Sequence, residues 1–121
     1  MSRPEALVIE DDPVQAQIFT QALEEAGYAT THIADGDGAL AYLQQHTPHL
    51  VVLDLHLPGT AGDAILHAIR QEPRLAATRV MLATADPRMA ETLQAESDLV
   101  LLKPVSYHQL RDLALRMLPE G

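Results

Sequence analysis

The sequence predicts an α/β fold in which a five-stranded parallel sheet is flanked by five helices. Short, continuous apolar runs recur along the chain, and most are followed by a segment whose apolar residues repeat with a helical period. Continuous apolar strands are typical of parallel strands covered on both faces, and alternating helices supply the crossovers that such a sheet needs. Because 121 residues is the usual length of one domain, we expect a single domain over residues 1–121.

The first predicted strand and helix are separated by an acidic tip. Residues 6–9 form an apolar run, acidic residues 10–12 close it, and Pro13 is a preset first-turn residue for a helix. Apolar residues then recur at intervals of four through residues 13–26, and Gly27 follows as a stop signal. The repeated positions are Val14, Ile18 and Ala22, with Phe19 and Leu23 beside them.

The second strand and helix are patterned more weakly. Residues 28–33 are rich in threonine and predict a strand, and the Asp-Gly-Asp-Gly stretch at residues 35–38 predicts a turn. An apolar stripe follows this turn and predicts a helix that ends before Pro48. The stripe consists of Ala39, Leu40 and Leu43.

Three more strands are predicted in the second half of the chain. They cover residues 50–53, ending at Asp54, then residues 80–84, and finally residues 99–102. A helix is expected after each strand, and the one after the fourth strand is short, from about residue 87 to residue 95. The apolar faces of the other two contain Ile65, Leu66 and Ile69, and Leu110, Leu113, Ala114 and Met117.

Composition and charge argue against several classes of function. Seventeen acidic against eight basic residues give a net charge of -9, which disfavours direct nucleic-acid binding. The chain has no cysteine, and its six histidines lack the i, i+4 spacing of a helical zinc site. No apolar run approaches the roughly 20 residues that span a membrane, and the N-terminal residues lack a signal-peptide core. We therefore expect a cytoplasmic protein that binds neither membrane nor nucleic acid.

Chemically active side chains follow or end four of the predicted strands. Glu10 and Asp11 follow the first strand, Asp54 ends the third, Thr84 ends the fourth and Lys103 follows the fifth. Ligands of such sheets bind beyond the carboxyl ends of the strands. Clustered carboxylates repel one another unless a cation compensates, and Mg²⁺ prefers a few carboxylate oxygens together with waters. Because an aspartate can also be a phosphoryl acceptor, this set predicts phosphoryl transfer assisted by Mg²⁺.

The order and spacing of these residues resemble the receiver domain of bacterial response regulators. The likeness covers nearly the whole chain, and it implies a flavodoxin-like, doubly wound sheet with strand order 2-1-3-4-5. The residues that carry it are Glu10-Asp11, Asp54 with Pro58 four residues on, Thr84-Ala85 and Lys103-Pro104.

The resemblance implies a metal site. Asp11 and Asp54 would be direct ligands of Mg²⁺, Glu10 a ligand through water, and the backbone carbonyl of His56 would complete the protein's share. Asp12 is not expected to be a primary ligand, because its place just before the predicted helix is that of a capping residue.

The resemblance also implies how the phosphoryl group is handled. Asp54 would be the phosphoacceptor, Thr84 would bond one phosphoryl oxygen, and Lys103 would pair with another. Receiver domains commonly have a cis peptide before the proline of Lys-Pro, which would aim the lysine inward. The side chains of His56 and Asp86 are expected to tune dephosphorylation by occupying the path of an attacking water.

The implied function is a signalling switch rather than a metabolic enzyme. The phosphoryl donor would be a sensor histidine kinase or a histidine phosphotransfer protein, and the altered surface would change binding to a downstream effector. Two alternatives are a degenerate receiver that acts as an unphosphorylated interaction module and a small Asp-dependent phosphohydrolase. His56 argues against the second alternative, because it stands where such enzymes have a second aspartate.

The segment after the fourth strand departs from the family pattern. Val100 and Val105 stand where receivers often have aromatic residues, and residues 93–98 are a shortened connection. Since valine has one stiff side-chain rotamer, an aromatic rotamer switch at Val100 is not expected.

Overall fold

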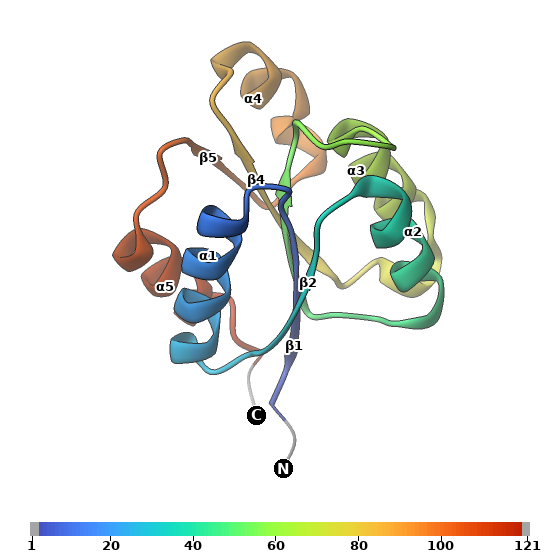
Figure 1. The fold of residues 1–121 in the computed structure, drawn as a ribbon. Coiled ribbons are helices and arrows are strands. Elements are labelled where there is room, and N and C mark those ends of the chain that lie inside the picture. The colour runs from blue at the N-terminus through green and yellow to red at the C-terminus, as the bar shows by residue number, and fades with distance from the viewer. Residues whose placement is uncertain (1–2, 120–121) are drawn as a thin grey trace.

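A five-stranded parallel sheet carries helices on both faces (Figure 1). The computed structural model describes residues 3–119. The strand order is β2-β1-β3-β4-β5, and every neighbouring pair is parallel. The predicted fold and strand order are therefore confirmed. The strands are β1 (Glu5–Ile9), β2 (Ala29–Ile33), β3 (Leu50–Asp54), β4 (Arg79–Thr84) and β5 (Leu99–Leu102). The predicted domain limits also include residues 1–2 and 120–121, which lie outside the described residues.

Each of the five strands is followed by a helix, as predicted, so that four helices connect strands and α5 follows β5. In Figure 1, α1 and α5 pack against each other on one face of the sheet, α2 and α3 cover the other face, and α4 lies at the top. The helices are α1 (Pro13–Ala26), α2 (Gly36–Gln45), α3 (Gly62–Gln71), α4 (Pro87–Leu93) and α5 (Tyr107–Arg116), with short 3₁₀ turns η1 (Pro73–Leu75) and η2 (Gln94–Glu96).

The central strand β3 shows why its sequence is apolar throughout. All five of its residues are buried, because the sheet is covered on both faces. Leu50 and Val52 belong to the core cluster beneath α1 and α5. Val51 and Leu53 belong to the cluster beneath α2 and α3. Each apolar residue of β3 therefore contributes to one of two cores, and the strand carries Asp54 to its tip in a fixed position.

The ends of α1 follow the sequence signals closely. The Asp12 carboxylate accepts hydrogen bonds from the amides of Val14 (2.9 Å) and Gln15 (3.2 Å), so the predicted capping role is confirmed. At the other end, Gly27 adopts a φ of +113°, a left-handed conformation that glycine tolerates best.

Five predicted boundaries differ from the structure. Strands β1 and β4 each begin one residue earlier than predicted, at Glu5 and Arg79. Residues 35–38 were expected to form a turn, but α2 already begins at Gly36, and Asp35 caps it by accepting a bond from the amide of Gly38. Strand β2 begins at Ala29 rather than at residue 28. Helix α4 ends at Leu93, and residues 94–96 form η2 instead of a last helical turn. Asp-Gly pairs serve turns and helix starts alike, so the sequence pattern alone did not separate the two.

Helix α4 differs from the other helices in its packing, because none of its residues is buried. Met89 and Leu93 are partly buried against the cluster beneath α2 and α3.

Within residues 3–119, no helix combines the length and hydropathy required to cross a membrane.

Candidate functional site at the carboxyl ends of the strands

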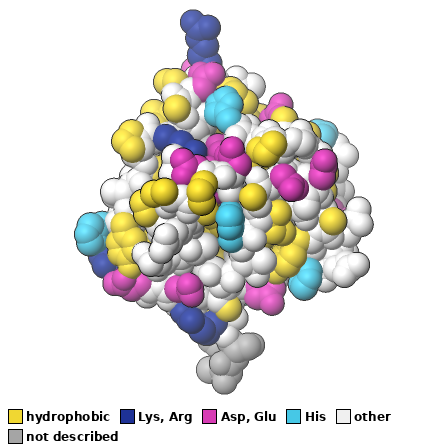
Figure 2. All heavy atoms as spheres, viewed as in Figure 1, with side chains coloured by type: hydrophobic (Ala, Val, Ile, Leu, Met, Phe, Trp, Pro, Cys, Tyr) yellow, Lys and Arg dark blue, Asp and Glu magenta, His cyan; other side chains and the backbone are white. Residues whose placement is uncertain are grey.

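Side chains from four strand ends gather at one edge of the sheet. Glu10 follows β1, Asp54 ends β3 and Thr84 ends β4, and the exposed fractions of these residues are 1%, 3% and 0%. Asp11 is exposed beside Glu10, and Lys103 follows β5. Figure 2, viewed as Figure 1, shows acidic side chains clustered on the upper part of the visible surface, with a basic side chain beside them.

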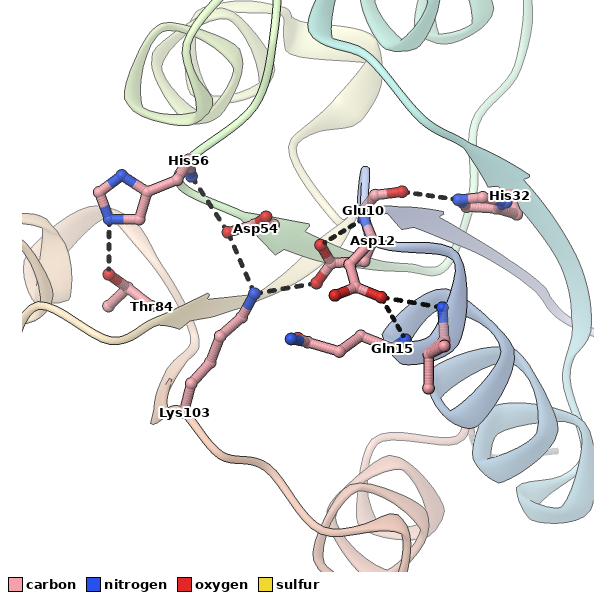
Figure 3. A network of polar contacts seen from close by, with 9 residues as sticks. Glu10, Asp12, Gln15, His32, Asp54, His56, Thr84 and Lys103 are labelled. Atoms are coloured by element: carbon pink, nitrogen blue, oxygen red, sulfur yellow. Dashed lines mark hydrogen bonds and ion pairs between the residues drawn. The ribbon is translucent and has the colours of Figure 1, made fainter.

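The three predicted carboxylates come close enough to share one cation. Glu10, Asp11 and Asp54 each offer an oxygen, and these oxygens lie within 4.8 Å of one another. The Lys103 ammonium lies 3.0 Å from Glu10 Oε1 and 3.4 Å from Asp54 Oδ1 (Figure 3). The sequence pattern predicted this convergence, whereas it did not predict the ion pair between Lys103 and Glu10.

The environment of Glu10 favours its neutral form. Burial, followed by the neighbouring Asp54 side chain, raises the pKa of Glu10 to about 7 even though Lys103 acts to lower it. The amide of Asp12 donates to Glu10 Oε2 at 3.2 Å. On the neighbouring strand, His32 Nε2 lies 2.7 Å from the backbone carbonyl oxygen of Glu10. His32 lies in the weakly patterned β2, and no sequence signal pointed to this contact.

The donor set fits a hard divalent cation. All three side chains offer carboxylate oxygens, which are the ligands that Mg²⁺ prefers. Glu10 and Asp54 are buried, whereas Asp11 is exposed, so one side of the cluster faces solvent, as an ion that keeps several waters requires. A divalent ion would also offset the carboxylate repulsion that Lys103 alone compensates only in part.

The loop after β3 fixes the orientation of Asp54. The amide of His56 donates to Asp54 Oδ1 at 3.0 Å, and the amide of Leu55 donates to the carbonyl of Ala83 in β4 at 3.2 Å. At the start of α3, a Cβ added to Gly62 would lie 2.6 Å from Leu55 Cα and 2.7 Å from the Asp54 carbonyl oxygen. Only glycine allows α3 to begin this close to the tip of β3.

Thr84 faces His56 rather than Asp54. The Thr84 hydroxyl accepts a hydrogen bond from the amide of Asp86 at 3.0 Å, and His56 Nε2 lies 3.4 Å from Thr84 Oγ1 (Figure 3). Within residues 3–119, the Thr84 hydroxyl takes part in these two hydrogen bonds and no others. The Asp86 carboxylate caps α4 by accepting from the amide of Arg88 at 2.9 Å. His56 and Asp86 thus both contact Thr84, and neither contact was predicted from the sequence.

In the atypical segment after β4, the Lys103–Pro104 peptide and the two valines have defined positions. The peptide bond between Lys103 and Pro104 is cis, and the lysine side chain points toward Glu10 and Asp54 (Figure 3). Val100 packs partly buried against the cluster beneath α2 and α3, and Val105 packs against the cluster beneath α1 and α5. These two valines therefore serve as packing residues.

Comparison with known families agrees with this fold and site. The model of the response regulator receiver domain matches residues 6–115. The chain therefore belongs to the receiver domain family of response regulators. Members of this family are the phosphoryl-accepting modules of two-component signalling. They act as switches and interact with histidine kinases and downstream effectors. The alternative of an unphosphorylated interaction module is not favoured by these relatives.

Three relatives illustrate the likeness. The "Probable transcriptional regulatory protein TcrX" of Mycobacterium tuberculosis is 35% identical over 108 residues, covering 86% of this chain and 45% of that protein. The signal receiver domain of a histidine kinase from Syntrophus aciditrophicus is 32% identical with a TM-score of 0.83, covering 94% and 89% of the two chains. The receiver domain of sensor histidine kinase PA1611 from Pseudomonas aeruginosa, described with a magnesium ion in its active site cleft, is 26% identical with a TM-score of 0.83, covering 94% and 96%. The chain spans less than half the length of the first curated relatives it matches.

Proposed function

We propose that this receiver domain accepts a phosphoryl group on Asp54 from a histidine kinase or a histidine phosphotransfer protein. A carboxylate oxygen of Asp54 forms the bond to phosphorus while the phosphorus–nitrogen bond of the donor's phosphohistidine breaks. The departing imidazole keeps the electron pair of that bond and takes up a proton from water. The product is an aspartyl phosphate at the tip of β3.

The convergence of three carboxylates and one ammonium is the observation that carries this proposal. The oxygens of Glu10, Asp11 and Asp54 lie within 4.8 Å of one another, and Lys103 Nζ lies 3.4 Å from Asp54 Oδ1. The amide of His56 orients the Asp54 carboxylate, and among residues 3–119 the N-cap residues of the helices are other residues. Such a cluster is costly unless a cation or a reaction makes use of it.

The remaining residues would stabilise the transferred group. Glu10, Asp11, Asp54 and the backbone carbonyl of His56 would hold Mg²⁺, which when bound neutralises charge on the carboxylates and on the phosphoryl oxygens. Lys103 offers a fixed positive charge to one phosphoryl oxygen. Thr84 would donate its hydroxyl hydrogen to another, giving up its contact with His56 to do so.

The phosphorylation site can be tested by mass. The protein is incubated with acetyl phosphate, with and without Mg²⁺, and the intact protein is weighed. We expect a gain of one phosphoryl group that requires Mg²⁺ and is lost in Asp54→Asn, because the amide is a poor nucleophile. The matched control is Asp63→Asn, since Asp63 is exposed in the first turn of α3, outside the carboxylate cluster.

Each result of this experiment has a definite meaning. A gain in the parent and in Asp63→Asn, but not in Asp54→Asn, supports the proposal. No gain in the parent at saturating donor and Mg²⁺ would support a degenerate receiver. Continuous hydrolysis of the donor without labelled protein would point to a phosphohydrolase.

The proposed output is a change of surface rather than a product. Phosphorylation would draw Thr84 and Lys103 toward the new phosphate, and Thr84 contacts the start of α4 through Asp86. The altered surface near α4 would then bind a downstream effector protein or domain. The proposal includes no direct contact with nucleic acid or membrane, and it keeps the cytoplasmic location predicted from the sequence.

A further inference from the structure

The loop between β3 and α3 is anchored at two places. At its beginning, the amide of His56 donates to Asp54 Oδ1 at 3.0 Å. At its far side, the amide of Gly36, the first residue of α2, donates to the carbonyl oxygen of Pro58 at 3.1 Å. None of the residues proposed for the site lies in α2 (Gly36–Gln45), so this second anchor needs its own explanation.

Side chains and close packing reinforce the second anchor. The Thr60 hydroxyl donates a hydrogen bond to Asp37 Oδ1. A Cβ added to Gly36 would overlap the Thr60 carbonyl oxygen and would lie 2.7 Å from its carbonyl carbon. A Cβ at Gly59, whose φ is +79°, would lie 3.1 Å from Asp37 Oδ2. The start of α2 and the loop therefore meet backbone to backbone, with one side-chain bond across the contact.

We infer that Thr60 and Asp37 are positioning residues for the metal site. Pro58 and Thr60 are only two and four residues beyond His56, whose backbone carbonyl is a proposed ligand of Mg²⁺. A peptide that is fixed on both sides holds the His56 carbonyl in one orientation before Mg²⁺ binds. This raises the affinity for Mg²⁺, because binding then has to order less of the loop. This inference rests on the proposed function, since it deepens the role of the same site.

The decisive variant is Thr60→Val, which keeps the branched shape and removes the hydroxyl. Affinity for Mg²⁺ is measured by titration calorimetry in the absence of any phosphoryl donor. We expect the dissociation constant to rise about tenfold, at the lower end of the effect of losing a group that orients a metal ligand. Thr60→Ser, which restores the donor, should return it to within about twofold of the parent.

Controls separate positioning from a general loss of structure. Thr20→Val removes a hydroxyl that bonds the carbonyl of Gln17 within α1, far from the loop, and should leave Mg²⁺ affinity unchanged. Thermal melts without Mg²⁺ should be similar for Thr60→Val and Thr60→Ser, because an exposed hydrogen bond contributes little to stability. Gly36→Ala provides an independent displacement of the loop and should also weaken Mg²⁺ binding.

The outcomes also separate this inference from the proposed function. Equal Mg²⁺ affinity in the parent, Thr60→Val and Gly36→Ala would overturn the inference, even if Asp54 is labelled normally. Weak binding in both variants, with recovery in Thr60→Ser, would support it. If the parent binds Mg²⁺ but acquires no phosphoryl group, the proposed function fails while the affinity comparison still decides the inference. A parent that binds no Mg²⁺ at millimolar concentration would overturn both.

Discussion

His56 is the residue whose side-chain role at the proposed site can be tested most directly. It is exposed, and its Nε2 lies 3.4 Å from the Thr84 hydroxyl, beside the proposed acceptor. We expect His56→Asn to shorten the half-life of the phosphorylated protein about threefold, equivalent to roughly 0.7 kcal/mol in the barrier, because the smaller side chain opens a path for water. The measurement follows the decay of the phosphoryl mass after the donor is removed.

Asp86 requires a more careful substitution in the same experiment. Its carboxylate caps α4, so Asp86→Ala would combine a change at the site with the loss of a cap, which costs about 1 kcal/mol. Asp86→Asn keeps an acceptor for the amide of Arg88 and removes only the charge. Unchanged half-lives in both His56→Asn and Asp86→Asn would remove the idea that these side chains tune hydrolysis.

At the residue scale, the sequence predicted which side chains come together better than it predicted their contacts. Glu10, Asp11 and Asp54 could be found because the carboxyl ends of parallel strands meet at one edge of the sheet. The contact between His56 and Thr84 could not be found, because it depends on side-chain rotamers that packing decides across two loops.

Among the elements, β2 and α5 are linked by one buried hydroxyl. Tyr28, just before β2, is fully buried, and its hydroxyl donates to the Ala114 carbonyl of α5 at 2.9 Å. Burial raises the pKa of Tyr28 to about 12. We expect Tyr28→Phe to lower the free energy of unfolding at neutral pH by about 1 kcal/mol, measured by urea denaturation.

The same tyrosine predicts a pH dependence with a definite sign. Because the folded protein holds the Tyr28 proton more tightly than the unfolded chain does, this contribution is fully present below pH 10 and is lost as pH rises through about 12. The parent should therefore lose stability faster than Tyr28→Phe between pH 10 and 12. Parallel stability curves for the two proteins over this range would contradict the prediction.

Element boundaries show where local signals were insufficient. The stretch at residues 35–38 was predicted as a turn because Asp and Gly favour turns, yet the contact of Gly36 with the loop after β3 makes it the first turn of α2. The tight β3–α3 connection follows from Gly62, whose closeness to Leu55 depends on tertiary structure and could not be predicted from periodicity. Helix α4 ended two residues early for a similar reason, since it has no buried face to extend it.

Across the whole molecule, stability is expected to be unequal. The β1 residues 6–9 and all five residues of β3 are buried, whereas α4 buries none. We expect backbone amides of α4 and η2 to show protection from hydrogen exchange on the order of 100-fold lower than those of β1 and β3, because they open locally without unfolding the sheet. Exchange followed by mass spectrometry of peptides measures this difference.

Helix α3 is the internal control for that experiment. It has ten residues against seven in α4, and it buries Ile65, Leu66 and Ile69. Strong protection in α3 together with weak protection in α4 is the expected pattern. Equal protection in the two helices would show that α4 is held by contacts beyond its partly buried Met89 and Leu93.

The shallow packing of α4 against the sheet has an evolutionary consequence. A helix whose side chains are all at least partly solvent-exposed can exchange most of them during sequence divergence at little cost to folding. Its neighbour β4, in contrast, is buried from residue 80 to residue 84 and tolerates few replacements. Descendants of this chain can therefore change the exposed surface of α4 while the sheet edge that holds the carboxylate cluster stays unaltered.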